Sequence, residues 1–80
     1  MNICDLKIND MAKVISVDIL NNAVKKHFLE MGLTRNTIIN VLKFAPMGDP
    51  ISIELRGYEL CIRKEDAKRV LVEVLKWKLL

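Results

Sequence analysis

The sequence has 80 residues, 51% of them hydrophobic but only 5% aromatic, so we expect one domain over residues 1–80 with a core of Ile, Leu, Val and Met. Its formal net charge of +3 lacks the basic stripe with interleaved aromatics that marks nucleic-acid binders, and we therefore expect no nucleic-acid partner. No stretch approaches the roughly 20 apolar residues of a membrane span and no signal-peptide plan opens the chain, which predicts a cytoplasmic protein without membrane insertion.

Residues 12–20 are rich in β-branched side chains, which predicts the first strand. A turn at Asn9-Asp10 precedes it, because Asn and Asp tolerate positive φ better than other non-glycine residues. Alternate positions of the strand share one face: Ile15, Val17 and Ile19. Ala12 and Val14 fall out of this phase, which predicts either a β-bulge or burial of both faces near the start.

Residues 22–31 change to a helical period and predict an amphipathic α-helix. Three apolar residues at i, i+4 and i+7 form its buried face: Val24, Phe28 and Met31. Asn21 or Asn22 can serve as the N-cap, since an amide oxygen accepts from an unpaired N–H of the first turn. Gly32 is expected at the left-handed position that ends the helix, with Leu33 folding back onto the last turn.

Residues 38–44 are apolar on both faces, which predicts a central strand or one that bends between two layers. The segment Ala45-Pro46-Met47-Gly48-Asp49-Pro50 follows and predicts a rigid corner. Each proline fixes φ and lacks a backbone donor, Gly48 takes positive φ cheaply, and Asp49 can accept from nearby backbone N–H groups.

Apolar and polar residues alternate over 51–56 and again over 58–63, with Arg56-Gly57 between the two runs. This pattern predicts a β-hairpin. Residues 64–69 then predict a short polar helical turn, in which Glu65 and Asp66 favour the N-terminus, and residues 70–74 predict the last strand.

The run APMGDPISIELRGYELCIR at 45–63, with Met31-Gly32-Leu33 upstream, closely resembles the FeoA family, small cytoplasmic SH3-like proteins associated with bacterial ferrous iron uptake. The resemblance covers about residues 3–74. It implies a mainly β fold, a small SH3-like β-barrel of about five strands with one α-helix (about 22–31) and a short helical turn (about 64–69). It also implies a partner, a FeoB-type membrane iron transporter with a cytoplasmic GTPase domain.

Two segments depart from the family pattern. Residues 34–37 replace a common Pro-Gly pair, and Asn36 can take the left-handed position of the glycine at modest cost. Residues 75–80, Leu-Lys-Trp-Lys-Leu-Leu, run beyond the usual family end. Three interpretations of this tail with Trp77 stay open: an extension of the last strand, a cover for apolar surface, or a frayed terminus.

The residues that carry chemistry do not form a catalytic pattern. Nucleophilic catalysis needs a Cys or Ser held beside a base, and the single histidine, His27, has no such neighbour in the sequence. The weak candidates for a metal site are His27, Cys61 and Cys4, which lie in different elements without ligand spacing. We expect no enzyme activity, no cofactor, no intrinsic metal site and no disulfide, since the absence of a secretory signal predicts a reducing compartment.

The leading hypothesis is therefore a non-enzymatic module that regulates or assembles a ferrous iron transporter. The candidate contact residues are those of the corner, the helix face and the hairpin tip: Pro46, Met47, Gly48, Asp49, Pro50, Lys26, His27, Glu30 and Arg56. Met47 is the most informative, because it is either an exposed contact or tucked into the mouth of the barrel. The corner can also be pure architecture. Two other classes stay open: a metal-responsive regulatory domain, and a weak homo-oligomer that uses exposed apolar surface.

Overall fold

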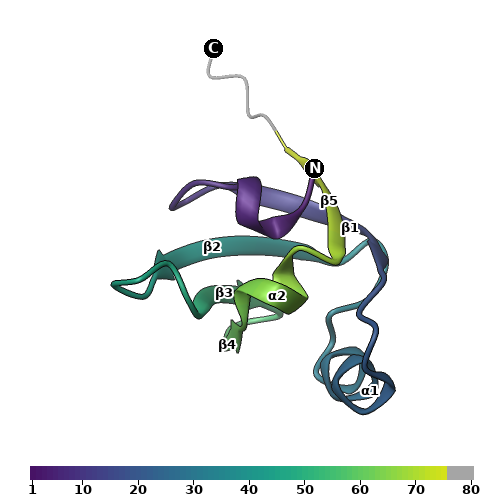
Figure 1. The fold of residues 1–80 in the computed structure, drawn as a ribbon. Coiled ribbons are helices and arrows are strands. Elements are labelled where there is room, and N and C mark those ends of the chain that lie inside the picture. The colour runs from purple at the N-terminus through teal and green to yellow at the C-terminus, as the bar shows by residue number, and fades with distance from the viewer. Residues whose placement is uncertain (76–80) are drawn as a thin grey trace.

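The computed structural model describes residues 1–75, so Trp77 and most of the tail lie outside it. Five strands form one antiparallel sheet in the order β4-β3-β2-β1-β5 (Figure 1). Their bounds are β1 Met11–Val17, β2 Ile38–Phe44, β3 Ile51–Leu55, β4 Tyr58–Ile62 and β5 Val70–Val74. β2 runs through the middle of the sheet, which confirms the central strand. Among the described residues β4 and β5 are not paired with each other, so hydrogen bonds do not close the predicted barrel.

The 3-10 turn η1 over Ile3–Asp5 precedes the first strand, and two α-helices join strands: α1 over Asn22–Glu30 and α2 over Lys64–Ala67. α1 stands to one side of the sheet, in the connection between β1 and β2 (Figure 1). Its position confirms the predicted helix, and α2 confirms the helical turn in a shorter form. η1, which buries Ile3, was not predicted from the sequence.

The ends of α1 are those that the sequence predicts. The side chain of Asn21 accepts from the N–H groups of Ala23 and Val24. At the other end the Leu33 N–H donates to the Phe28 carbonyl at 2.9 Å and the Gly32 N–H to the Leu29 carbonyl at 3.1 Å. Gly32 has φ 101°, so this is a Schellman stop with glycine at the left-handed position.

One core connects the sheet, α1, α2 and the N-terminal turn, with buried residues from every strand. β1 shows how a bulge redistributes the faces. The pairing register between β1 and β5 shifts between Val14 and Ser16, so Ile15 is the extra residue and its side chain is 38% exposed. The predicted bulge is confirmed, while the expectation that Ile15 shares the face of Val17 and Ile19 is wrong.

The second face of β2 is not buried. Ile39 and Val41 lie in the core, whereas Ile38 and Leu42 are 39% and 37% exposed. The register with β3 shifts between Val41 and Lys43, which makes Leu42 the extra residue of another irregularity. The continuous apolar run of this strand therefore reflects one buried face and an exposed apolar strip.

Asn36 takes φ 72°, so it occupies the left-handed position expected in place of a glycine. We expect Asn36→Ala to lower the free energy of unfolding by about 1 kcal/mol, because a side chain with Cβ and no local hydrogen bonding pays the full left-handed penalty. Asn36→Gly should be neutral or slightly stabilising. Urea denaturation of the three proteins tests this, and equal midpoints for Ala and Asn would contradict it.

Candidate docking surface

The corner at 45–50 is closed by its own backbone. The Ala45 N–H donates to the Pro50 carbonyl at 3.0 Å and the Gly48 N–H donates to the Ala45 carbonyl at 2.7 Å. Gly48 has φ 81°, as the sequence predicts, and the Asp49–Pro50 peptide is cis. Met47 is 90% exposed at the tip. The alternative that Met47 tucks into the mouth of the barrel is therefore wrong.

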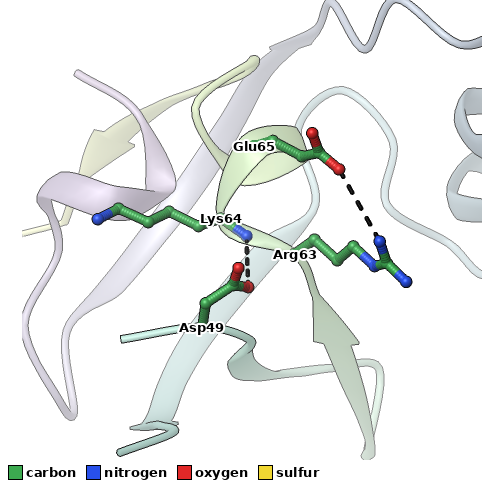
Figure 2. Close-up of polar contacts among 4 residues, drawn as sticks. All are labelled: Asp49, Arg63, Lys64 and Glu65. Carbon is green, nitrogen blue, oxygen red and sulfur yellow. Dashed lines mark hydrogen bonds and ion pairs between the residues drawn. The ribbon is translucent and has the colours of Figure 1, made fainter. Parts of the chain in front are cut away.

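Asp49 fastens the corner to α2 (Figure 2). Its Oδ1 accepts from the Lys64 N–H at 2.9 Å, across 15 residues of sequence. Lys64 is the first residue of α2, and the N-cap residue Arg63 supplies no side-chain hydrogen bond of its own. Asp49 thus satisfies one of the unpaired N–H groups at the start of the helix. The expectation that Asp49 bonds N–H groups close in sequence is corrected: its partner is a remote one.

Two adjoining grooves lie near this corner, and only the smaller is lined by residues of the corner itself. The larger, about 920 Å³, lies between α1 and the end of β4; its lining includes Leu20, Val24, Phe28 and His27. The smaller, about 650 Å³, is lined by Lys68 and by Asp49 and Pro50 of the corner. Arg63 and Glu65 line both grooves and separate them. We call the corner and these two grooves together the docking surface.

The structure therefore brings together some of the candidate contact residues and separates others. His27 and the corner lie at opposite ends of the docking surface. Lys26 and Glu30 are exposed on α1 but line neither groove. Arg56 belongs to a third, smaller hollow of about 430 Å³ with Arg35 and Ile38.

Arg56 also packs against the end of α1. A Cβ at Gly32 would lie 3.1 Å from the Cδ and Nε of Arg56 and 3.2 Å from the hydroxyl of Tyr58. Arg56 itself has φ 51° and Gly57 has φ 87°, so these two residues make the tight turn of the predicted hairpin. The hairpin tip thus packs directly against the Schellman stop that ends α1.

Apart from His27 and Cys61, the residues that line the grooves without belonging to the corner were not predicted from the sequence. Leu20 is 74% exposed just before the N-cap of α1, and Arg63, Glu65 and Lys68 come from the segment around α2. No local pattern distinguishes them from ordinary surface residues. They become neighbours because Asp49 holds α2 beside the corner and Phe28 anchors α1 on the core.

The three weak metal candidates do not converge. Within residues 1–75 no group of three or more His, Cys, Asp and Glu side chains could hold a metal ion. His27 and Cys61 line the same groove, whereas the Cys4 Sγ contacts the Lys64 carbonyl at 3.5 Å. Burial raises the pKa of the Cys4 thiol despite the nearby Lys68 and Lys64, which disfavours the thiolate that a metal would need. Both cysteines are free thiols.

Sheet order, hairpin and connecting helices define a small SH3-like domain with an exposed corner and two adjoining grooves. No helix in residues 1–75 is long and apolar enough to cross a membrane. The profile of the FeoA domain family matches residues 1–74. This chain therefore belongs to the FeoA family, whose members take part in ferrous iron transport.

The relatives agree with this assignment. A fusion of Fe(2+) transport protein A with the Fe(2+) transporter FeoB in Porphyromonas gingivalis is 31% identical over 75 residues, covering 94% of this chain and 9% of its own length. The FeoA protein of Chlorobium tepidum superposes with a TM-score of 0.89 at 37% identity, over 95% of this chain and 71% of that one. FeoA of Stenotrophomonas maltophilia, described as a prokaryotic SH3 domain protein and solved with zinc, gives a TM-score of 0.79 at 25% identity, over 91% of this chain and 89% of its own.

The last comparison supports the predicted SH3-like fold. The chain spans only about a tenth of the length of the P. gingivalis fusion, which joins an A-type segment and a FeoB-type transporter in one polypeptide.

Proposed function

We propose that this chain is a non-enzymatic accessory protein of ferrous iron uptake that binds the cytoplasmic GTPase domain of a FeoB-type transporter. The observation that carries the proposal is Met47, a flexible apolar side chain that is 90% exposed on a corner held by backbone and side-chain hydrogen bonds. The fusion of the two proteins in P. gingivalis supports the choice of partner, because covalent linkage places an A-type domain permanently beside the transporter.

The corner suits a protein partner because it is ordered before binding. A rigid loop loses little conformational entropy on association, so the contacts of its exposed residues contribute more fully to affinity. Met47 can fill an apolar pocket of varied shape, since methionine is unbranched and polarisable. The smaller groove adds charged groups at Arg63 and Lys68 next to the corner, and the larger groove adds exposed apolar surface at Leu20.

Calorimetric titration with the cytoplasmic domain of the cognate transporter, loaded with GDP or with a GTP analogue, tests the proposal. We expect saturable binding that Met47→Asp weakens at least about tenfold, because a charge replaces an apolar anchor that is desolvated in the complex. Met47 contacts nothing in the core, so circular dichroism and the melting temperature of the variant should be unchanged.

A matched control is Ile8→Asp, which also places a carboxylate at an exposed apolar residue but lies outside both grooves. It should bind as the wild type does. Absence of binding in both nucleotide states, with and without Fe²⁺, would exclude a direct contact with the GTPase domain. If the two substitutions weakened binding equally, the contact with the GTPase domain would not be at the corner.

A further inference from the structure

The two edge strands of the sheet, β5 and β4, differ in whether other residues cover them. The β5 edge is covered by the N-terminal residues: Asn2 forms a bridge with Leu71, and the Val72 N–H donates to the Met1 carbonyl at 2.9 Å. At the opposite edge, no strand or bridge is paired with the outer side of β4 within residues 1–75. An unpaired edge is a template for another strand, and small proteins usually cover it.

The hairpin determines which backbone groups of β4 face outward. Leu55 and Tyr58 flank the two-residue turn and face each other, so they form a hydrogen-bonded pair. Alternation then directs the N–H and C=O groups of Glu59 and Cys61 away from β3. No backbone hydrogen bond from a turn, loop or cap in residues 1–75 reaches either of them. The open edge therefore carries both donors and acceptors.

Space beside this edge is available. The groove of about 920 Å³ is lined by Cys61 and Arg63 on one side and by α1 on the other. Arg63 continues the outward-facing series at 59 and 61, and its carbonyl already accepts from the N–H groups of Asp66 and Ala67. A strand added here would consequently end its ladder at Arg63.

We propose that a second copy of this chain pairs with this edge, β4 against β4 in antiparallel orientation, with the two-fold axis at Cys61. In this register the two Cys61 residues face each other and exchange two backbone hydrogen bonds. Each Glu59 lies opposite the partner's Arg63, whose N–H donates to the Glu59 carbonyl. Four hydrogen bonds form in total, and none of them needs the occupied carbonyl of Arg63.

Charge complementarity selects this register. Glu59 and Arg63 flank Cys61 symmetrically, so an axis at residue 61 places unlike charges opposite each other twice. An axis at Glu59 would instead oppose two carboxylates, and axes at Leu60 or Ile62 would leave both charges without a directly opposite counter-charge. Because the interface is isologous, the same strand supplies both halves of each ion pair.

Both charged groups can take part without losing a strong contact. Arg63 Nη1 lies 4.0 Å from Glu65 Oε1 (Figure 2). The two side chains are 78% and 75% exposed. Such an exposed pair contributes little and is readily exchanged. Glu59 accepts a hydrogen bond from Ser52 with one carboxylate oxygen, Oε2, which leaves Oε1 for the partner.

Charge reversal tests the pairing by sedimentation equilibrium over a wide range of protein concentration. The wild type should form a weak dimer, and Glu59→Arg or Arg63→Glu alone should weaken it at least about tenfold, since each places like charges opposite one another. The double exchange, Glu59→Arg with Arg63→Glu, should restore dimerisation. Lys7→Glu is the control, because it makes the same change of net charge as Arg63→Glu at a residue outside β4. This variant should dimerise as the wild type does.

Cross-linking tests the same register in a protein whose β4 strand keeps its native residues. In a Cys4→Ser background a short bis-maleimide should join two chains through Cys61, because Cα atoms of a hydrogen-bonded antiparallel pair are about 5.5 Å apart. Arg63→Glu in that background should strongly lower the yield of the product. Three results would each overturn the proposal. The wild type could be a monomer at every concentration, or the double exchange could fail to restore dimerisation. The yield of cross-linked product could also be the same with and without Arg63→Glu. None of these outcomes depends on Met47 or on the transporter.

Discussion

Phe28→Ala should lower the free energy of unfolding by about 3–5 kcal/mol, the usual cost of removing a large buried aromatic side chain. Phe28 is 6% exposed and is the one buried residue that α1 contributes to the core within the described chain. A domain of this size has a total stability of about 4–12 kcal/mol at 0.05–0.15 kcal/mol per residue. At the lower end of that range the substitution should leave a large fraction of the protein unfolded, and at the upper end it should lower the denaturation midpoint without unfolding the protein.

Denaturation in urea, followed by circular dichroism, measures this effect. Leu29→Ala is the matched control, because the next residue of the same helix is 38% exposed and should cost roughly 1 kcal/mol or less. Similar losses for the two variants would show that α1 is not anchored through Phe28. The larger groove would then lack a fixed wall, since Phe28 and its neighbour His27 both line it.

Gly32→Val should cost about 2–5 kcal/mol, for two separable reasons. At φ 101° an L-residue pays roughly 1–2 kcal/mol of backbone strain. Its Cβ would also lie 3.1–3.2 Å from the side chains of Arg56 and Tyr58, and the further methyl groups of valine would force both to move. Overpacking of this kind typically costs another 1–3 kcal/mol.

Gly48→Val separates the two contributions. Gly48 has φ 81°, so it pays a similar strain, but a Cβ there meets nothing within 4 Å. The difference in unfolding free energy between the two variants should equal the contact term, about 1–3 kcal/mol. If both variants lost the same stability, the close approach of Arg56 to the end of α1 would contribute nothing.

The stability of α1 and the shape of the proposed docking surface depend on the same residues. α1 forms one wall of the larger groove, and its position depends on Phe28 inside the core and on Gly32 at the hairpin tip. Loss of either anchor should therefore disturb binding through the groove as well as folding. Met47→Asp affects the surface alone, so the two kinds of variant distinguish a contact residue from a residue that positions the site.

Local chemistry was sufficient to predict most of the elements. The change of apolar period marks α1, Asn21 and Gly32 mark its ends, and Arg56-Gly57 marks the hairpin, because each signal depends on neighbours within one or two turns of chain. β1 is one element that differs in detail from the prediction. Its bulge was predicted, but which residue it would expose depends on pairing with β5, more than 50 residues away in the chain.

By itself, then, the sequence determined the five strands, α1 and α2, their order and the family, since periodicity, caps and turns act over short distances and the corner motif is specific. Only the tertiary structure decided that Asp49 caps α2, that His27 and the corner share one surface while Arg56 does not, and that β4 is the open edge. These facts depend on contacts between residues far apart in sequence. Such contacts form only when the core brings the elements together, and they leave no periodic trace in the chain.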